Sequence, residues 1–273
     1  MSNNLAAVRT LIRWTDNDES LEQMSEEQRT LGESPVRPAR AIRPGRRGMR
    51  GHAPLLGRSV AFESTLERDL LTHLSLDGSL TEIVEQPVTI RYADRTGRRR
   101  RYTPDYFTRH AGPPDRAYLI EVKHRADLFA DWARLKPGIM AGRRHARENG
   151  WRFMILTDKE LRGPDLGNAA FLARFRGWPR DERHEEHLVH RLAIIGPADP
   201  AKLLVAAYAS EANRAAALGY LWKLVATGRI RADLSAPLTM ETEVWIDYDS
   251  DWAPYDPYSY KRTGGAWSAA PFA

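Results

Sequence analysis

The fold of this chain is decided by two short runs, Arg-Tyr-Thr-Pro-Asp-Tyr-Phe at residues 101–107 and Ala-Tyr-Leu-Ile-Glu-Val-Lys at residues 117–123. Each run has the length of a β-strand, and a Gly-Pro-Pro turn signal lies between them. Side chains alternate between the two faces of a strand, so Glu121 and Lys123 project to the same side. Hairpin pairing of the two runs can bring Asp105 next to Glu121.

The predicted hairpin thus brings two carboxylates and one ammonium group together. Carboxylate oxygens suit a hard cation such as Mg²⁺, which takes oxygen ligands and keeps several of its waters. The alternative is an ion-pair cluster on the edge of a sheet, because acids and lysines are common. These three residues alone leave both interpretations open.

An amphipathic helix is predicted earlier in the chain, at about residues 64–75, because leucines recur there at helical spacing. Glu63 and Glu67 are four residues apart and share one face of this helix. Ser64 and Glu67 also have the spacing of a capping box, in which the acid satisfies amide groups at the helix start. Two roles stay open for Glu67: a cap, or a functional acid if the helix packs against the hairpin.

The other elements of this region alternate between strands and helices. An extended run at residues 83–92 ends in a hairpin loop at residues 94–97, a helix opens at Pro137, and an apolar strand follows at residues 151–156. A helix that connects two strands of one sheet predicts a parallel pair in an otherwise antiparallel sheet. The sequence therefore predicts an α/β domain at residues 60–165.

Arginine is concentrated in two segments of a chain whose formal net charge is +5. Residues 32–58 are rich in Gly, Pro and Arg and are not expected to pack a core, so they form either a solvated linker or a basic arm along phosphates. Arg98 to Arg101 alternate around an exposed strand and are predicted to contact phosphates, with a solvated hairpin tip as the alternative. The basic excess favours a polyanionic partner.

The last third of the chain is predicted to form a second domain, at residues 166–248. Helices are expected at residues 200–208 and 212–226, followed by strands at residues 229–234 and 243–246. Helix, turn, helix and two-stranded ribbon is the element order of a winged helix. The second of these helices carries few basic residues, so DNA reading and protein docking are equally open for this domain.

Composition excludes several classes of protein. The chain has no cysteine, which excludes disulfides and thiolate zinc sites. Its amino terminus lacks the basic and apolar regions of a signal peptide, and no apolar run approaches the roughly 18 residues of a membrane helix. We expect a soluble, cytoplasmic, nucleoid-associated protein with a flexible aromatic tail at residues 249–273.

Five motifs follow one another in a recognisable order: Glu-Ser-Thr-Leu-Glu-Arg-Asp at 63–69, Glu-Gln-Pro-Val at 85–88, Tyr-Thr-Pro-Asp-Tyr-Phe at 102–107, Ile-Glu-Val-Lys at 120–123 and Phe-Met-Ile-Leu-Thr-Asp-Lys-Glu at 153–160. In this order they resemble the TnsA-type endonuclease subunit of heteromeric transposases, a branch of the PD-(D/E)xK nucleases. The resemblance covers about residues 60–165 and extends loosely to about residue 246. It implies an α/β fold with a restriction-endonuclease-like mixed sheet core and helices on both faces. An arm and basic linker at residues 1–59 would precede this core, and the winged-helix-like domain would follow it.

The resemblance also implies roles for individual residues. The family's helix acid corresponds to Glu67, with Glu63 one turn earlier as the alternative, and its Pro-Asp aspartate corresponds to Asp105. Its (Glu or Gln)-x-Lys element corresponds to Glu121 and Lys123. Together these imply a catalytic set of one helix acid, two strand acids and one lysine.

The implied cofactor is Mg²⁺, with Mn²⁺ as a substitute, held by Asp105, Glu121 and the Val122 carbonyl. The implied partners are double-stranded DNA, a DDE-type transposase subunit and an AAA+ ATPase regulator. DNA backbone contacts are expected from Arg46, Arg47, Arg50, Arg98, Arg99 and Arg100.

Two rival functions remain. One is a stand-alone restriction-type nuclease or Holliday-junction resolvase, which would cut without partners. The other is a non-catalytic DNA-binding adaptor with a decayed nuclease fold. The intact set of three acids and a lysine argues against decay.

Overall fold

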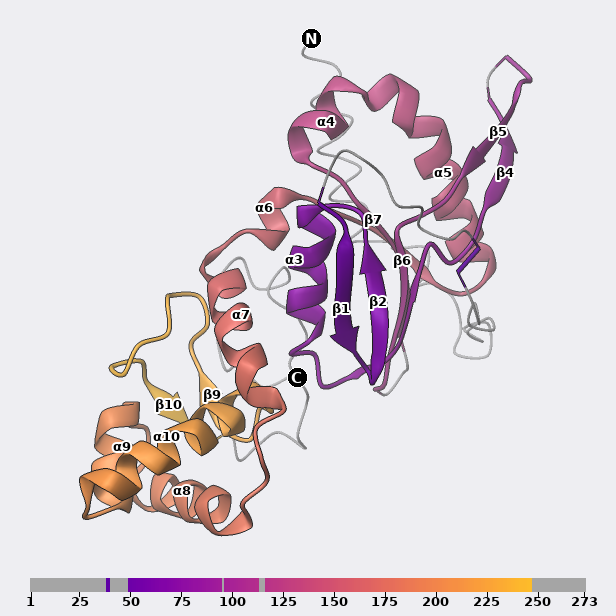
Figure 1. Ribbon diagram of the computed structural model, residues 1–273. Coiled ribbons are helices and arrows are strands. Elements are labelled where there is room, and N and C mark those ends of the chain that lie inside the picture. The colour runs from indigo at the N-terminus through magenta and orange to yellow at the C-terminus, as the bar shows by residue number, and fades with distance from the viewer. Residues whose placement is uncertain (1–37, 40–48, 95, 113–115, 247–273) are drawn as a thin grey trace, which may run out of the picture. The chain divides into compact units, whose positions relative to one another are not determined.

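The computed structural model describes residues 38–39, 49–94, 96–112 and 116–246 (Figure 1). The chain divides into two compact units. The first consists of residues up to 71 together with 80–161, and the second of residues 72–79 together with those from 162 onward. Among the described residues, no helix is both long and apolar enough to cross a membrane.

A four-stranded mixed sheet forms the centre of the first unit. Its strands lie in the order β3, β6, β7, β8, with bounds Leu80–Glu85, Tyr106–His110, Arg116–Val122 and Arg152–Leu156. β6 pairs antiparallel with both β3 and β7, whereas β8 pairs parallel with β7. The predicted parallel pair in an otherwise antiparallel sheet is therefore confirmed.

Both faces of this sheet are covered, which explains why its two central strands, β6 and β7, are buried along most of their length. The crossover from β7 to β8 contains α4 (Arg125–Ala130) and α5 (Trp132–Glu148), and Ile139 of α5 shares an apolar cluster with Phe107 and Leu119. On the opposite face, the Tyr106 hydroxyl bonds the backbone of β2 (Arg58–Phe62) and a side chain of α3 (Thr65–Leu74). Alternation along β6 thus ties the sheet to both layers.

α5 begins earlier than the sequence predicts. Pro137 was expected to open this helix, but α5 starts at Trp132 and Pro137 lies inside it. Pro137 lies past the first four amides of the helix, which have no intrahelical acceptor. Because proline lacks an N–H, it therefore removes one intrahelical hydrogen bond, to the carbonyl four residues earlier. The preference of proline for the first helical turn therefore predicts the start of α5 more than one turn too late.

A hairpin forms where a linker was expected. β1 (Gly51–Leu55) pairs antiparallel with β2, although residues 51–58 belong to the segment that was not expected to pack a core. Leu56 and Gly57 both have positive φ, which fits the two-residue turn that joins hairpin strands tightly. Leu55 and Val60 are buried. The prediction missed this short amphipathic hairpin because the segment is rich in Gly, Pro and Arg, a composition typical of a linker.

A second hairpin, β4 (Ile90–Ala93) with β5 (Arg99–Tyr102), extends away from the sheet beside α5 (Figure 1). A Cβ atom on Gly142 of α5 would lie 2.5 Å from the Tyr102 ring and 2.8 Å from the Phe153 ring. Only glycine lets the helix approach both rings so closely. This contact fixes the base of the hairpin against α5.

The second unit is mainly helical. Its helices are α7 (Pro164–Arg176), α8 (Glu182–Ile195), α9 (Pro200–Ala207) and α10 (Glu211–Ala226), followed by two short strands, β9 (Arg231–Ala232) and β10 (Val244–Trp245). Val244 pairs with Ala232 and also forms a bridge with Ala198. The predicted helices and strands of this unit are present, although both strands are shorter than expected. Leu203, Leu221 and Val244 share its core.

Candidate active site

Asp105 and Glu121 lie at the same end of the paired strands β6 and β7. The register pairs Tyr106 with Ile120, so Asp105, which immediately precedes β6, comes opposite Glu121. The Asp105 N–H donates to the Ile120 carbonyl at 3.0 Å, and the Val122 N–H donates to Asp105 Oδ2 at 2.6 Å. The hairpin thus brings the two acids together as the sequence predicts.

Glu121 is almost fully buried, with 6% of its surface exposed. The Tyr102 hydroxyl donates to its Oε2 at 2.7 Å, and Lys123 Nζ lies 3.7 Å from its Oε1. Lys123 therefore projects to the same side as Glu121, as strand alternation predicts. The carboxylate is held at one oxygen by a neutral donor and at the other by a cation.

Glu67 has the capping role that its spacing predicts. Its Oε2 accepts from the Glu63 N–H at 2.8 Å, its Oε1 accepts from the Ser64 hydroxyl at 2.9 Å, and its own N–H donates to Ser64 Oγ at 3.1 Å. The Tyr106 hydroxyl also lies 3.3 Å from Oε2. Since Tyr106 is the first residue of β6, Glu67 also lies close to the strand that Asp105 precedes.

The carboxylates form one electrostatic cluster. Burial, and next the charges of Glu121 and Glu67, raise the pKa of Asp105 well above its ordinary value, against the Val122 N–H and Lys123. Burial also raises the pKa of Glu121, and Glu67 adds to this rise, whereas Lys123 and the Tyr102 hydroxyl oppose it. Glu67 thus acts electrostatically on both strand acids.

The donor atoms of this cluster fit a hard divalent cation. Asp105, Glu121 and the Val122 carbonyl offer oxygen ligands, which Mg²⁺ and Mn²⁺ prefer. Within the described residues Asp105 Oδ1 accepts no hydrogen bond, because the Val122 N–H bonds only Oδ2. A cation would also offset the repulsion between buried carboxylates. Among the described residues, no three His, Cys, Asp or Glu side chains are already grouped around a metal-sized space.

The predicted DNA-binding arginines lie in different parts of the chain. Arg50 lies 3.5 Å from Glu63, whereas Arg46 and Arg47 fall outside the described residues. The arginines at the tip of the β4–β5 hairpin are exposed, and one of them, Arg100, donates from Nε to Asp94 Oδ2 at 2.9 Å. The structure therefore does not gather the six into a single described patch.

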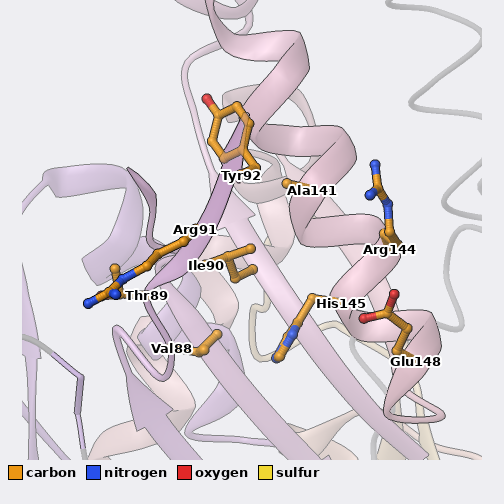
Figure 2. Close-up of a pocket in the computed structure, with 9 residues that line it drawn as sticks. All are labelled: Val88, Thr89, Ile90, Arg91, Tyr92, Ala141, Arg144, His145 and Glu148. Carbon is orange, nitrogen blue, oxygen red and sulfur yellow. The ribbon is translucent and has the colours of Figure 1, made fainter. Parts of the chain in front are cut away.

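A separate pocket of about 440 Å³ lies between β4 and α5 (Figure 2). Residues 88–92 line one side of it, and Ala141, Arg144, His145 and Glu148 line the other. None of the clustered carboxylates contributes to its lining. The pocket therefore marks the hairpin–helix boundary and lies apart from the candidate site.

Two tyrosines belong to the site although the sequence analysis assigned them no polar role. Tyr102 bonds Glu121, and the fully buried Tyr106 bonds Glu67 and the Ala61 carbonyl. A buried tyrosine usually places its hydroxyl on a partner, and that is the signal that was available in the Tyr-Thr-Pro-Asp-Tyr run. Their partners depend on tertiary packing and could not be read from spacing.

Comparison with known families identifies the domain that carries this cluster. Residues 77–158 match the family described as TnsA-like endonuclease N terminal. The match includes Asp105, Glu121 and Lys123 and begins after Glu67. None of the curated proteins compared with this chain matches it. Residues 77–158 of this chain therefore carry a TnsA-like endonuclease N-terminal domain.

Proposed function

We propose that this protein is a metal-dependent DNA endonuclease, the subunit of a heteromeric transposase that hydrolyses a phosphodiester on one strand at each transposon end. One observation carries the proposal. The buried Glu121, the partly buried Asp105 and Lys123 meet at one end of β6 and β7 inside a TnsA-like endonuclease domain.

In this proposal Asp105, Glu121 and the Val122 carbonyl hold Mg²⁺, for which Mn²⁺ can substitute. The bound ion would supply Lewis-acid stabilisation of the phosphate and lower the pKa of a water ligand. Lys123 places its ammonium next to the carboxylates, where it orients the attacking water or offsets negative charge on the phosphate. Tyr102 fixes the orientation of Glu121 by donating to one of its oxygens.

Glu67 is proposed as the third acid. Its cap bonds hold the carboxylate at the start of α3, and the Tyr106 hydroxyl faces the same oxygen that accepts from Glu63. It therefore adds negative charge to the cluster without leaving the helix terminus. In this role it would hold a water molecule of the metal, or a second ion.

The second unit is proposed to be a winged helix that docks on protein. Ala198, β10 and β9 form a three-segment ribbon beside the α9–α10 pair, which is the order of that fold. Both bases predicted on α10 are already engaged. Lys223 Nζ lies 2.8 Å from Glu185 Oε1, and Arg214 donates to the Ala209 carbonyl at 3.1 Å. This favours docking on the AAA+ ATPase regulator over reading of base edges, and leaves sequence recognition to the DDE-type transposase subunit.

A plasmid cleavage assay tests the function. The chain is incubated with supercoiled DNA carrying transposon ends, with and without a DDE-type transposase encoded beside it, in Mg²⁺ and in EDTA. In Mg²⁺ we expect one strand to be cut, and in EDTA we expect no cleavage. Asp105→Ala and Lys123→Ala should each abolish the cleavage in Mg²⁺. Wild-type cleavage by both variants contradicts the site, and strong cleavage without the transposase favours a stand-alone nuclease.

A further inference from the structure

The β4–β5 hairpin has an inner face against α5 and an outer face of arginines. The Tyr102 ring packs on α5 at Gly142, and Figure 2 shows Ile90 directed toward that helix and Arg91 directed away from it. Side chains alternate along each strand, and Arg91 is paired in register with Arg101. The outer face, which we call the arginine face, consists of Arg91, Arg99 and Arg101, all exposed.

The arginine face holds like charges opposite one another. Arg91 and Arg101 are cross-strand partners, and Arg99 is paired with Ala93 one step further toward the tip. Like charges directly opposite on an antiparallel pair repel each other and destabilise it. Within the described part of the chain, none of the three forms an ion pair, whereas Arg100 on the inner face bonds Asp94. An anion bound across this face would relieve the repulsion.

The arginine face leads directly to the candidate active site. The hydroxyls of Thr89 and Thr103 lie 3.2 Å apart, so the strands stay together beyond the hairpin toward Asp105. An extended chain advances about 3.3 Å per residue, so Arg101 and Arg99 lie at most about 13 and 20 Å from Asp105. One DNA strand carries a phosphate about every 3.4 Å of duplex axis, so these distances span about four to six base-pair steps.

We propose that the arginine face binds the phosphate backbone of duplex DNA on one side of the cut and thereby sets the distance between the bound duplex and the scissile phosphate. The inference rests on the proposed nuclease function and deepens it. The inference adds Arg91 and Arg101 to the predicted DNA contacts. Arg100 is expected to contribute less to phosphate binding than Arg99 and Arg101, because Asp94 already neutralises its charge. Contacts of this kind position the protein without reading sequence.

The test measures binding to a fluorescently labelled duplex at rising salt, in EDTA, with the full chain carrying Asp105→Ala so that the DNA stays intact. Arg99→Gln and Arg101→Gln are each expected to reduce the slope of log K against log salt by about 1, because each removes one phosphate contact. Arg100→Gln is expected to reduce it less. Arg134→Gln is the matched control, since its guanidinium bonds Asp131 at the start of α5 and lies outside the arginine face.

Slopes that stay unchanged in both Arg99→Gln and Arg101→Gln, or fall equally in Arg100→Gln, overturn the inference. Cleavage by the chain with Asp105 intact is measured separately. An active nuclease with unchanged slopes refutes the arginine face alone, and reduced slopes in a chain that never cleaves refute the nuclease function alone. Thermal unfolding checks the fold, because relieving the repulsion should leave the melting temperature of Arg101→Gln equal to or above that of the parent.

Discussion

Glu121 shows how single residues make the candidate site. Burial alone would favour its neutral form, and a neutral carboxyl is a poor ligand for a cation. The Tyr102 hydroxyl and the Lys123 ammonium both favour the ionised form. The hydroxyl contacts Oε2 and the ammonium lies near Oε1. Tyr102 therefore links the hairpin that carries the arginine face to the acid that is proposed to bind metal.

Tyr102→Phe is expected to slow cleavage while leaving the fold intact. It removes one hydrogen bond to a buried charged group, which is worth about 1.5–3 kcal/mol, or roughly 10–100-fold. Since this bond lowers the pKa of Glu121, its loss raises that pKa, and the acid limb of the pH–rate profile should move to higher pH. The measurement is cleavage rate against pH at several Mg²⁺ concentrations.

Tyr92→Phe is the control for this prediction, because it deletes the same atom from the same face of the hairpin without touching Glu121. It should keep the parent profile. A Tyr102→Phe variant whose rate falls but whose pH profile stays in place would show that the hydroxyl does not act through the ionisation of Glu121.

The residues of the candidate site were predictable where strand geometry alone decides their position. Alternation placed Lys123 beside Glu121, and hairpin pairing placed Asp105 opposite it. The cap spacing of Ser64 and Glu67 was also sufficient for the helix start. The two tyrosine hydroxyls were not predictable, because their partners come from residues 19 and 39 positions away, brought close only by packing.

At the scale of elements, prediction succeeded where one pattern dominated. The apolar runs of β7 and β8, with a helical segment between them, specified a parallel pair. It failed for β1 and β2, whose burial depends on contact with β3 as well as on their own composition. Arg58, read as linker, donates to the Ile83 carbonyl at 2.8 Å and to Glu85 Oε2 at 3.0 Å. Tertiary contacts here outweigh a weak local signal.

The contact of the β4–β5 hairpin with α5 gives a prediction at this scale. Gly142→Ala would place a methyl group 2.5 Å from the Tyr102 ring and is expected to destabilise the first unit by about 1–3 kcal/mol. By displacing Tyr102 it should also reduce cleavage. Thermal unfolding and the plasmid assay measure the two effects.

Gly167→Ala in α7 is the matched control, because nothing lies within 4 Å of the added Cβ. There the substitution removes only the flexibility of glycine and should stabilise by up to about 1 kcal/mol. Equal effects of the two substitutions would mean that the hairpin is not held by close approach to α5.

The whole molecule consists of two compact units for which we propose different tasks, and this division has a measurable consequence. All four proposed catalytic residues belong to the first unit, so Mg²⁺ should stabilise that unit alone. A ligand that binds only the folded state stabilises it by RT ln(1 + [L]/Kd), which is about 2.7 kcal/mol at 100 times Kd. We expect two transitions in a thermal scan, of which Mg²⁺ raises one, and Asp105→Ala should abolish that shift.

Two substitutions assign these transitions. Gly142→Ala should lower the Mg²⁺-sensitive transition. Lys223→Ala should lower the other one and destabilise the second unit by about 1.5–3 kcal/mol, because it removes the closest cation of the buried Glu185 carboxylate and leaves Arg229, at 3.7 Å, as its partner. If Mg²⁺ instead raised the transition that Lys223→Ala lowers, or left both in place, the metal would not bind at the carboxylates of the first unit. That outcome would contradict the proposal that the first unit carries the metal-dependent chemistry.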